Sequence, residues 1–577
     1  MQGALGVWRF DPVKDQAKTI QPLAGAGETD AKHKLRFNWN AAMAISAHKP
    51  DRFYMGSQFV HRSEDMGETW SKISPDLTTN DPAKQNQENS GGLSQDNSGA
   101  ENHCTVFTIA ESPLDENIIW AGTDDGNLQL TKDGGKTWTN LIANVPDLPK
   151  GTMVYHIEAS VFGKGNAYAV FTGYQTGDKN TYVYKTTDFG ATWKSIVTLD
   201  IYGFARNIQE DYVNENLLFV GTEFGLYITL NGGKNWYKFT NNMPAANVHF
   251  IELHKKTNDL VIATHGRGII IIDDISPLRQ LTEEAMNKDL YFFTTKPTKI
   301  SETNGFGGAS TETQFVGENP TKAARIIYYL KKRHTLGKMS LEIQDANGNK
   351  ITEIGPGKSK GINVVEWNYN TKPPKIATAK TFAFGGFTSP RVPAGTYKVV
   401  IQKGKDTYTN DLVVEYDSKS EIPLADRKLQ EETTKKLYNM SQELAYLVYE
   451  LDETLKAAEN VKGKNASTAK GVAPLISELT KLKETLVVTK GDNYVGSAEP
   501  QLREKMSELY SKVADSYYKP NSAEMGNLDA IETRFNTAKA DFKKAKDKNL
   551  KKLTSLMSEN KFGELPIKSF DEFLKQP

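Results

Sequence analysis

Short apolar runs separated by polar turns fill the first half of the chain. Examples are the runs at 53–57, 118–123, 217–222 and 260–264, and each is followed by a Gly-containing turn and a second short apolar run. Runs of four to six residues rich in β-branched and aromatic side chains are typical of strands. The pattern predicts a series of four-stranded sheet units, about five of them, over residues 1–285.

The pattern changes twice after this segment. Residues 286–418 contain short strand-like runs with hairpin signals and a Pro393–Tyr397 corner, which predicts an immunoglobulin-like or fibronectin-like β-sandwich. Residues 419–577 carry apolar residues at intervals of three and four, which predicts a bundle of about four helices. The clearest stripe consists of Leu437, Met440, Leu444, Leu447, Leu451 and Leu455. The predicted fold class is therefore mainly β with a C-terminal α-helical bundle.

Four polar turns in the first segment share a motif, Ser/Thr-x-Asp-x-Gly-x-Thr-Trp. They lie at 62–70, 131–138, 186–193 and 229–236, and the fourth has Asn in place of Asp. In such a turn the Asp accepts backbone hydrogen bonds from N–H groups two or three residues on, Gly supplies positive φ, and Trp buries its ring between sheets. We therefore predict structural roles for Asp65, Trp70, Asp133, Trp138, Asp188, Trp193, Asn231 and Trp236.

Composition excludes several classes of function. The 577 residues include 71 Lys+Arg and 71 Asp+Glu, so the net charge is zero and nothing indicates binding of nucleic acid. No apolar run of 18 or more residues is present, so no membrane span is predicted, and the N-terminus shows no signal peptide. The single cysteine, Cys104, excludes an internal disulfide, and we expect a buried, inert thiol in a strand at 104–110.

Strand direction alternates within each predicted unit, so the turns between second and third strands lie on the face opposite the Trp turns. A connection at 74–103, which is unusually long, belongs to the same face as the second-to-third turns. We take this face as a candidate ligand-binding rim formed by Gln58, Asp124, Asp125, Glu223, His265 and Arg267. No cluster has metal-ligand spacing and no phosphate loop or nucleophile elbow is present, so no metal and no cofactor are predicted.

The chain resembles the large bacterial BNR, or Asp-box, repeat proteins with a sortilin-like β-propeller, which are often labelled glycosyl hydrolases. Besides the Trp turns, the resemblance rests on Arg36–Asn40, Tyr54–Gln58, Ile73–Thr78, Phe107–Pro113, Trp120–Gly126, Val220–Gly225, Ala263–Gly268 and Asp273–Arg279. It covers essentially the whole chain and implies a secreted or cell-envelope protein. Such proteins have about twice as many blades, so the resemblance also implies an absent N-terminal half of the propeller as a partner of this portion.

Two functions follow from these observations. The first is a non-catalytic, extracytoplasmic binding protein for a peptide, protein or glycan, which presents the rim to its ligand. The alternative is a sialidase-like or xyloglucanase-like glycoside hydrolase, in which Asp124 or Asp125 and Glu223 act as acid and base. That chemistry needs two carboxyls about 5 to 9.5 Å apart, one of them protonated. The sequence leaves open whether the protein is an enzyme.

Overall fold

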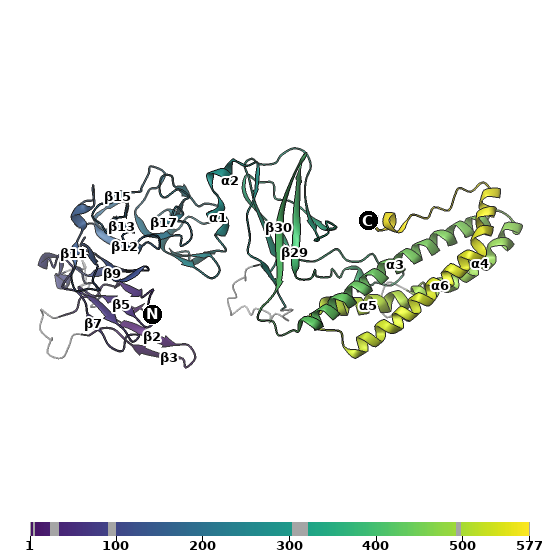
Figure 1. The fold of residues 1–577 in the computed structure, drawn as a ribbon, viewed down its shortest axis with the longest axis horizontal. Coiled ribbons are helices and arrows are strands. Elements are labelled where there is room, and N and C mark those ends of the chain that lie inside the picture. Colours follow the sequence, from purple (N-terminus) through teal and green to yellow (C-terminus); the bar gives the residue numbers. More distant parts are fainter. Residues whose placement is uncertain are drawn as a thin grey trace. The chain divides into compact units, whose positions relative to one another are not determined.

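The computed structural model describes residues 2–3, 6–23, 34–89, 100–302, 321–491 and 498–575. The chain divides into two compact units, Met1–Ala285 and Met286–Pro577. It is mainly β, with many small sheets, and its longest helices lie in the C-terminal part (Figure 1). This confirms the predicted combination of β-structure followed by helices. The middle of the long connection at 74–103 lies outside the described residues.

The first unit consists of small antiparallel sheets whose strands follow each other in chain order. Four sheets have four strands each. The first contains β4 (Met43–Ile45), β5 (Phe53–Gly56), β6 (Val60–Ser63) and β7 (Ser71–Lys72), and the second contains β8 (Val106–Ser112), β9 (Asp115–Thr123), β10 (Leu128–Thr131) and β11 (Thr139–Asn140). The third contains β12 (Met153–Ala159), β13 (Ala167–Gly173), β14 (Asp178–Thr186) and β15 (Lys194–Ser195), and the fourth contains β16 (Ala205–Glu210), β17 (Leu218–Thr222), β18 (Gly225–Thr229) and β19 (Tyr237–Lys238). Two have three strands: β1 (Gln2–Gly3), β2 (Gly6–Asp11) and β3 (Gln16–Thr19); β20 (Asn247–His254), β21 (Asp259–His265) and β22 (Ile269–Ile272). Five sheets thus run from β4 to β22, and each is a meander of the type found in propeller blades.

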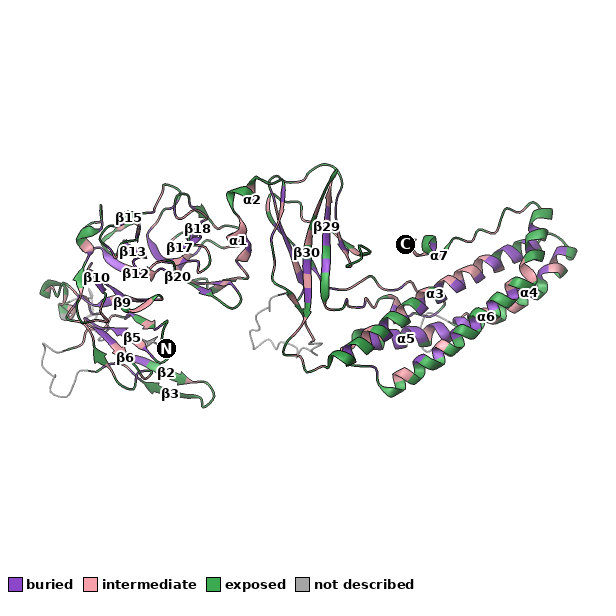
Figure 2. Cartoon of the chain, viewed as in Figure 1, coloured by how far each residue is buried: buried purple, intermediate pink, exposed green. Residues whose placement is uncertain are grey.

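Successive sheets pack through the first strand of each sheet, here called the inner strand: β8, β12, β16 and β20. Glycine in the second strand of one sheet allows close approach to the inner strand of the next. A Cβ built at Gly122 would lie 2.4 Å from Val154 Cγ1, and one at Gly221 would lie 2.6 Å from Val248 Cγ1. The buried residues between the sheets, purple in Figure 2, form a separate apolar core for each interface.

The four Trp turns share one pattern of hydrogen bonds. In the first turn, Asp65 Oδ1 accepts a bond from the Thr69 backbone N–H (2.8 Å), and Asp65 Oδ2 accepts one from the Thr69 hydroxyl (2.7 Å). Asp133 and Asp188 repeat these contacts, and Asn231 accepts the equivalent backbone bond. The donor N–H lies four residues after the Asp or Asn, and not two or three as expected from the sequence. The side chain therefore bridges the full length of the turn.

The tryptophans of these turns tie each sheet to the one before it. The indole N–H of Trp70, Trp138 and Trp236 donates to the backbone carbonyl just after the last strand of the preceding sheet, at distances of 2.7 to 2.9 Å. Trp193 and Trp236 are buried, whereas Trp70 and Trp138 are only half-buried. The Trp turns therefore join sheets on the face opposite the candidate rim.

The second unit begins with two β-sheets that share one apolar core. One contains β23 (Leu290–Phe292), β25 (Ala324–Leu330) and β28 (Gly361–Trp367); the other contains β24 (Thr298–Ile300), β30 (Asp406–Tyr416), β29 (Gly395–Lys403), β26 (Met339–Gln344) and β27 (Lys350–Ile354). At the predicted corner, the Tyr397 hydroxyl donates to the Pro393 carbonyl four residues upstream (2.6 Å). The immunoglobulin-like or fibronectin-like topology stays a prediction.

Four long helices follow and enclose a single apolar core (Figures 1 and 2). They are α3 (Leu424–Lys462), α4 (Ala466–Leu486), α5 (Leu502–Asp515) and α6 (Ser522–Glu559); the short helices are α1 (Ser276–Gln280), α2 (Glu283–Asn287) and α7 (Phe570–Leu574). Five members of the predicted leucine and methionine stripe are buried in α3, and Leu455 packs at the margin of the core. No helix within the described ranges has the length and apolar character to cross a membrane.

Candidate ligand-binding site

The candidate rim residues lie in equivalent turns, between the second and third strands of their sheets. Gln58 lies in the β5–β6 turn, Asp124 and Asp125 in the β9–β10 turn, and Glu223 in the β17–β18 turn. His265 ends β21, and Arg267 lies in the β21–β22 turn. These side chains nevertheless differ in their access to solvent, because other segments of the first unit cover several of them.

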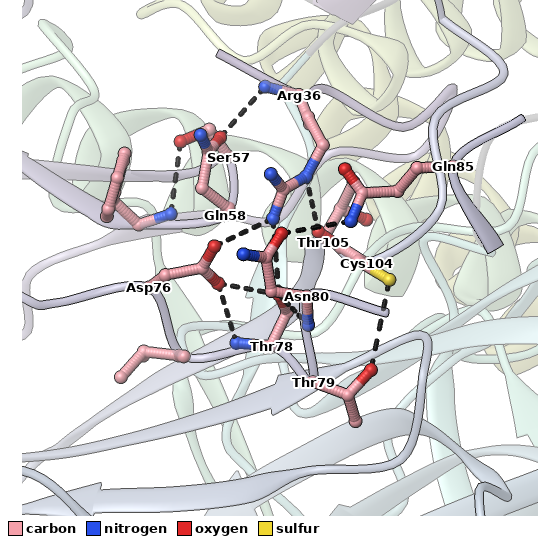
Figure 3. Close-up of polar contacts among 12 residues, drawn as sticks. Arg36, Ser57, Gln58, Asp76, Thr78, Thr79, Asn80, Gln85, Cys104 and Thr105 are labelled. Carbon is pink, nitrogen blue, oxygen red and sulfur yellow. Dashed lines mark hydrogen bonds and ion pairs between the residues drawn. The ribbon is translucent and has the colours of Figure 1, made fainter. Parts of the chain in front are cut away.

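Gln58 is buried, with 2% of its surface exposed. Its Oε1 accepts a bond from the Arg36 backbone N–H (2.9 Å), and its Nε2 donates to the Lys34 carbonyl (3.0 Å). Figure 3 shows the surrounding network, in which the Arg36 guanidinium pairs with Asp76 (2.8 Å) and donates to the Cys104 carbonyl (3.1 Å). Both ends of the Gln58 amide are thus occupied within the protein, so this residue has a structural role and does not face a ligand.

Cys104, in the same network, is buried as expected, but it precedes β8 instead of lying in a strand. Its backbone has a φ of 58°, which places it in the left-handed region. Burial raises the pKa of the thiol to about 11, and the nearby Asp125 carboxylate adds to this effect. A thiol with this pKa stays protonated near neutral pH and is a poor nucleophile.

Asp125 anchors the long connection to the β9–β10 turn. Its carboxylate accepts bonds from the Thr79 backbone N–H (2.7 Å) and hydroxyl (2.6 Å) and from the Thr123 hydroxyl (2.5 Å). Burial by itself would raise the pKa of Asp125, but the hydrogen bonds from Thr123 and Thr79 lower it overall. The residue is therefore an ionised, fully bonded support and not an open acid or base.

Asp124 is also buried, but it borders a cavity. Its carboxylate accepts bonds from the Thr105 backbone N–H (2.8 Å) and hydroxyl (2.7 Å) and from the Asn38 amide (3.2 Å), and His103 Nδ1 lies 3.6 Å away. Burial raises the pKa of Asp124, and the charge of His103 opposes this change. The hydrogen bonds fix the carboxylate in the wall of the cavity.

The other three rim candidates are more accessible. His265 and Arg267 are exposed, and the His265 ring stacks on His249 with 5.4 Å between ring centroids. Glu223 is half-buried, and its Oε1 is a buried atom with no hydrogen-bond partner among the described residues. The structure does not place Glu223, His265 or Arg267 in the wall of the cavity that contains Asp124.

This cavity is small, about 80 Å³, and mostly polar. It is lined by Asn38, Asn40, His103, Phe107, Asp124, Met153, Tyr155, Tyr174, Gln175 and Arg206. Three of the four-stranded sheets contribute to it, through the inner strands β8, β12 and β16 and the turns that follow β9 and β13. The cavity is thus built where neighbouring sheets meet on the face predicted for ligand binding.

A β-bulge in each inner strand determines which side chains line up in this region. The strand register shifts between Val106 and Thr108, Val154 and His156, Ala205 and Asn207, and Val248 and Phe250. The extra residues are Phe107, Tyr155, Arg206 and His249, and their side chains are neighbours across successive sheets. Bulges re-aim side chains and are frequent next to functional sites.

Arg206 is the central member of this row and is surrounded by aromatic rings, an arrangement that we call the Arg206 cage. Its Cζ lies 4.3 Å from the ring centroid of Tyr174, 4.7 Å from that of Tyr155 and 4.9 Å from that of Phe204. Only 7% of the Arg206 surface is exposed, and its Nε makes no hydrogen bond. No carboxylate in the described part of the chain lies within ion-pair distance of this guanidinium.

The charge of Arg206 influences the groups around it. Burial lowers the pKa of His249, and the charges of Arg206 and His265 lower it further. The pKa of Tyr155 is raised by burial, and Arg206 opposes this change. The lowered pKa of His249 favours its neutral imidazole near pH 7. Arg206 forms no ion pair among the described residues, and the buried carboxylate of Asp124 lines the same cavity.

This row was not among the predicted site residues, although the repeats contain a signal for it. The inner strands align as Val106–Ile109, Val154–Ile157, Ala205–Ile208 and Val248–Ile251, with a small apolar residue first and a buried isoleucine last. The residue after the first position is the bulge residue, and it differs in each repeat. The turn after β13, which supplies Tyr174, was missed because it is a 3₁₀ turn without an Asp-Gly signal.

A larger cavity, of about 660 Å³, lies in the second unit between its β-sheets and helices α3 and α5. Its buried guanidinium, that of Arg427, is paired with Glu302 and also donates to Ser420. The Tyr416 hydroxyl there donates to Glu431. These polar groups are bonded to each other, so the Arg206 cage is the stronger candidate for ligand binding. Within the described ranges, no group of three or more His, Cys, Asp or Glu side chains could hold a metal ion.

No family model and no curated protein matches this chain. Solved structures do match. The GH74 xyloglucanase from Xanthomonas campestris is 17% identical over 44% of this chain and 38% of that chain, with a TM-score of 0.31. The GH74 enzyme of Niastella koreensis is 13% identical over 72% and 70% of the two chains, with a TM-score of 0.30. YCF48 bound to D1 peptide is 14% identical over 46% and 74%, with a TM-score of 0.28.

The matched region spans well under two thirds of the Xanthomonas enzyme. These solved proteins are β-propellers, a fold class that the succession of small sheets in the first unit also indicates. They include enzymes as well as a protein bound to a peptide, and the similarity is too low to choose between catalysis and binding. Function has to be argued from the site itself.

Proposed function

We propose that this chain is a non-catalytic binding protein, in which the Arg206 cage holds a carboxylate of a peptide, protein or glycan outside the cytoplasm. The carrying observation is a buried guanidinium with aromatic rings around it and no carboxylate partner in the described structure. The extracytoplasmic location rests on the resemblance to sortilin-like propeller proteins. The same resemblance supports an N-terminal propeller half as a further partner.

The energetics favour an anionic ligand. A buried charge whose partner is missing costs about 3–5 kcal/mol. Cation–π contacts stabilise a charge in a desolvated site by about 2 kcal/mol, which is less than this cost. The Nε–H of Arg206 has no hydrogen-bond partner in the described structure, so this group remains available for an acceptor. A carboxylate suits this geometry, since guanidinium and carboxylate form paired, charge-assisted hydrogen bonds.

The hydrolase alternative has no comparable support. Asp124 and Asp125, the suggested partners of Glu223, are both engaged by several hydrogen bonds. Asp124 borders the cavity, whereas Asp125 and Glu223 do not. We therefore expect no hydrolysis of sialosides or β-glucans by this chain. Turnover that is abolished by Asp124→Asn and Glu223→Gln would favour the enzyme instead.

Binding measurements with matched ligands test the proposal. Calorimetry compares a peptide with a free C-terminal carboxylate to its amide, and sialyllactose to lactose. One charge-assisted pair is worth about 1.5–3 kcal/mol, so at least one of the carboxylates should bind about tenfold more tightly than its neutral counterpart. Arg206→Met should remove this difference, whereas Arg333→Met, at an exposed arginine of the second unit, should keep it. Equal binding of acids and neutral forms would refute the proposal.

A further inference from the structure

Two glutamates face each other farther along the inner strands. Glu158 lies on β12 and Glu252 on β20. On each strand the glutamate is two residues beyond a ring, His156 or Phe250, so ring and carboxylate share one face. The rings of His156 and Phe250 meet edge to face, with 5.8 Å between their centroids, so these two faces are directed toward one another. We call the region between them the channel cluster.

Among the described residues, the carboxylates of the channel cluster have His156 within ion-pair distance but no Lys or Arg. Glu158 Oε1 accepts a bond from the Gln209 amide (2.7 Å), and Glu158 Oε2 lies 3.9 Å from His156 Nε2. Burial raises the pKa of Glu252 and the charge of Glu158 raises it further, whereas the charges of His156 and Lys255 oppose this change. No Lys or Arg in the described residues forms an ion pair with either glutamate.

A neighbouring side chain also lacks a partner, and this indicates a ligand. Asn207 is 1% exposed, and neither its Nδ2 nor its Oδ1 makes a hydrogen bond in the described structure. It lies two residues before Gln209 on β16, so it shares the face on which Gln209 contacts Glu158. Buried amides are normally satisfied, and each exception needs an explanation. A polar group bound between the sheets would provide one.

We propose that the channel cluster binds the basic end, an ammonium or guanidinium, of the ligand whose carboxylate lies on Arg206. This rests on the proposed function for the acidic end alone. Gln209 is three residues beyond Arg206 on the same strand, so the two ends are about 10 Å apart at about 3.3 Å per residue. A peptide with a lysine or arginine two residues before its free C-terminus has this spacing.

The two carboxylates favour a cationic ligand, and the residues around them favour an organic cation over a metal ion. Within the described residues the glutamates are not part of a group of three or more potential metal ligands. Phe250, beside the glutamates, is 48% exposed, so its ring can contact an alkylammonium or guanidinium. Asn207 Oδ1 is an additional acceptor for an N–H group.

Calorimetry with the full chain and three peptides tests this inference. The peptides are acetyl-Lys-Ala-Ala with a free carboxylate, its C-terminal amide, and acetyl-Met-Ala-Ala with a free carboxylate. The lysine peptide should bind about tenfold more tightly than the methionine peptide. Glu158→Gln and Glu252→Gln, on different strands, should each reduce this preference, while Glu215→Gln, at an exposed glutamate outside the cluster, should preserve it. Circular dichroism verifies that each variant is folded.

The acidic and basic ends are distinguished by separate comparisons. If lysine is preferred but the acid and amide bind equally, the channel cluster is supported and the proposed function of Arg206 fails. If the acid is preferred but lysine and methionine peptides bind equally, the inference about the channel cluster is overturned while the proposed function stands. Absence of binding at millimolar peptide concentrations overturns both proposals. A loss of affinity in the glutamate variants that is equal for the lysine and methionine peptides overturns the inference about the channel cluster.

Discussion

Trp236 and Trp193 occupy equivalent places in two successive Trp turns but differ in one hydrogen bond. The indole N–H of Trp236 donates to the Ile196 carbonyl of the preceding sheet (2.7 Å). The indole N–H of Trp193 is buried without a partner, and its ring packs edge to face on Trp120 with 5.9 Å between centroids. Phe replaces the ring in both places but has no N–H, so the pair isolates the contribution of the hydrogen bond.

The two substitutions should therefore have different costs. Loss of ring area is similar for both and amounts to about 1 kcal/mol. Trp236→Phe also leaves the Ile196 carbonyl without its donor, which adds about 1–2 kcal/mol. Trp193→Phe instead removes a buried donor that has no partner, and this gain in free energy offsets the loss from the smaller ring. We expect the opening free energy of the sheets to fall about 2 kcal/mol further in Trp236→Phe than in Trp193→Phe.

Hydrogen exchange of the full chain, followed by mass spectrometry on peptides from β14, β15 and β18, measures this difference locally. A difference of about 2 kcal/mol corresponds to about 30-fold faster exchange in Trp236→Phe. Peptides from the helical bundle serve as an internal control and should not change. Equal acceleration by the two substitutions would show that the hydrogen bond does not hold the sheets together.

Three further predictions concern the same unit. Hydrogen bonds from the hydroxyl and backbone of Thr69 hold the pKa of Asp65 at about 2. The ionised form of Asp65 therefore stabilises the fold above about pH 4, and this contribution is lost as the pH falls toward 2. The unfolding free energy of Asp65→Asn should lack this pH dependence, and that of Asn231→Asp should acquire it. Gly122→Ala should lower the thermal unfolding temperature, since its Cβ would lie 2.4 Å from a side chain of β12; an unchanged temperature would show that the sheets can separate freely. Asp125→Ala should accelerate hydrogen exchange in the connection at 74–89 without affecting peptide binding, and protection equal to wild type would argue against its anchoring role.

Local patterns in the sequence predicted much of the architecture. The apolar runs and Gly-containing turns indicated small sheets, and the stripe from Leu437 to Leu451 indicated the first long helix of the bundle. The repeated spacing between Asp65 and Trp70 located the turns that join the sheets. These features depend on neighbours within one turn or hairpin, so the amino-acid sequence by itself determines them.

The candidate site required the tertiary structure. Gln58 and Asp125 have sequence contexts typical of exposed turns, but the segments at 34–38 and 74–89 cover them and use their hydrogen-bonding groups. Arg206 is inconspicuous in the sequence and becomes central only because a bulge directs it toward aromatic rings from two sheets. Access to solvent and the balance of charge depend on contacts between residues far apart in the chain, whereas periodicity describes neighbours. For this reason the sequence determined the sheets and helices of this protein, and the packing of sheets against one another decided which of its polar groups remained free to bind a ligand.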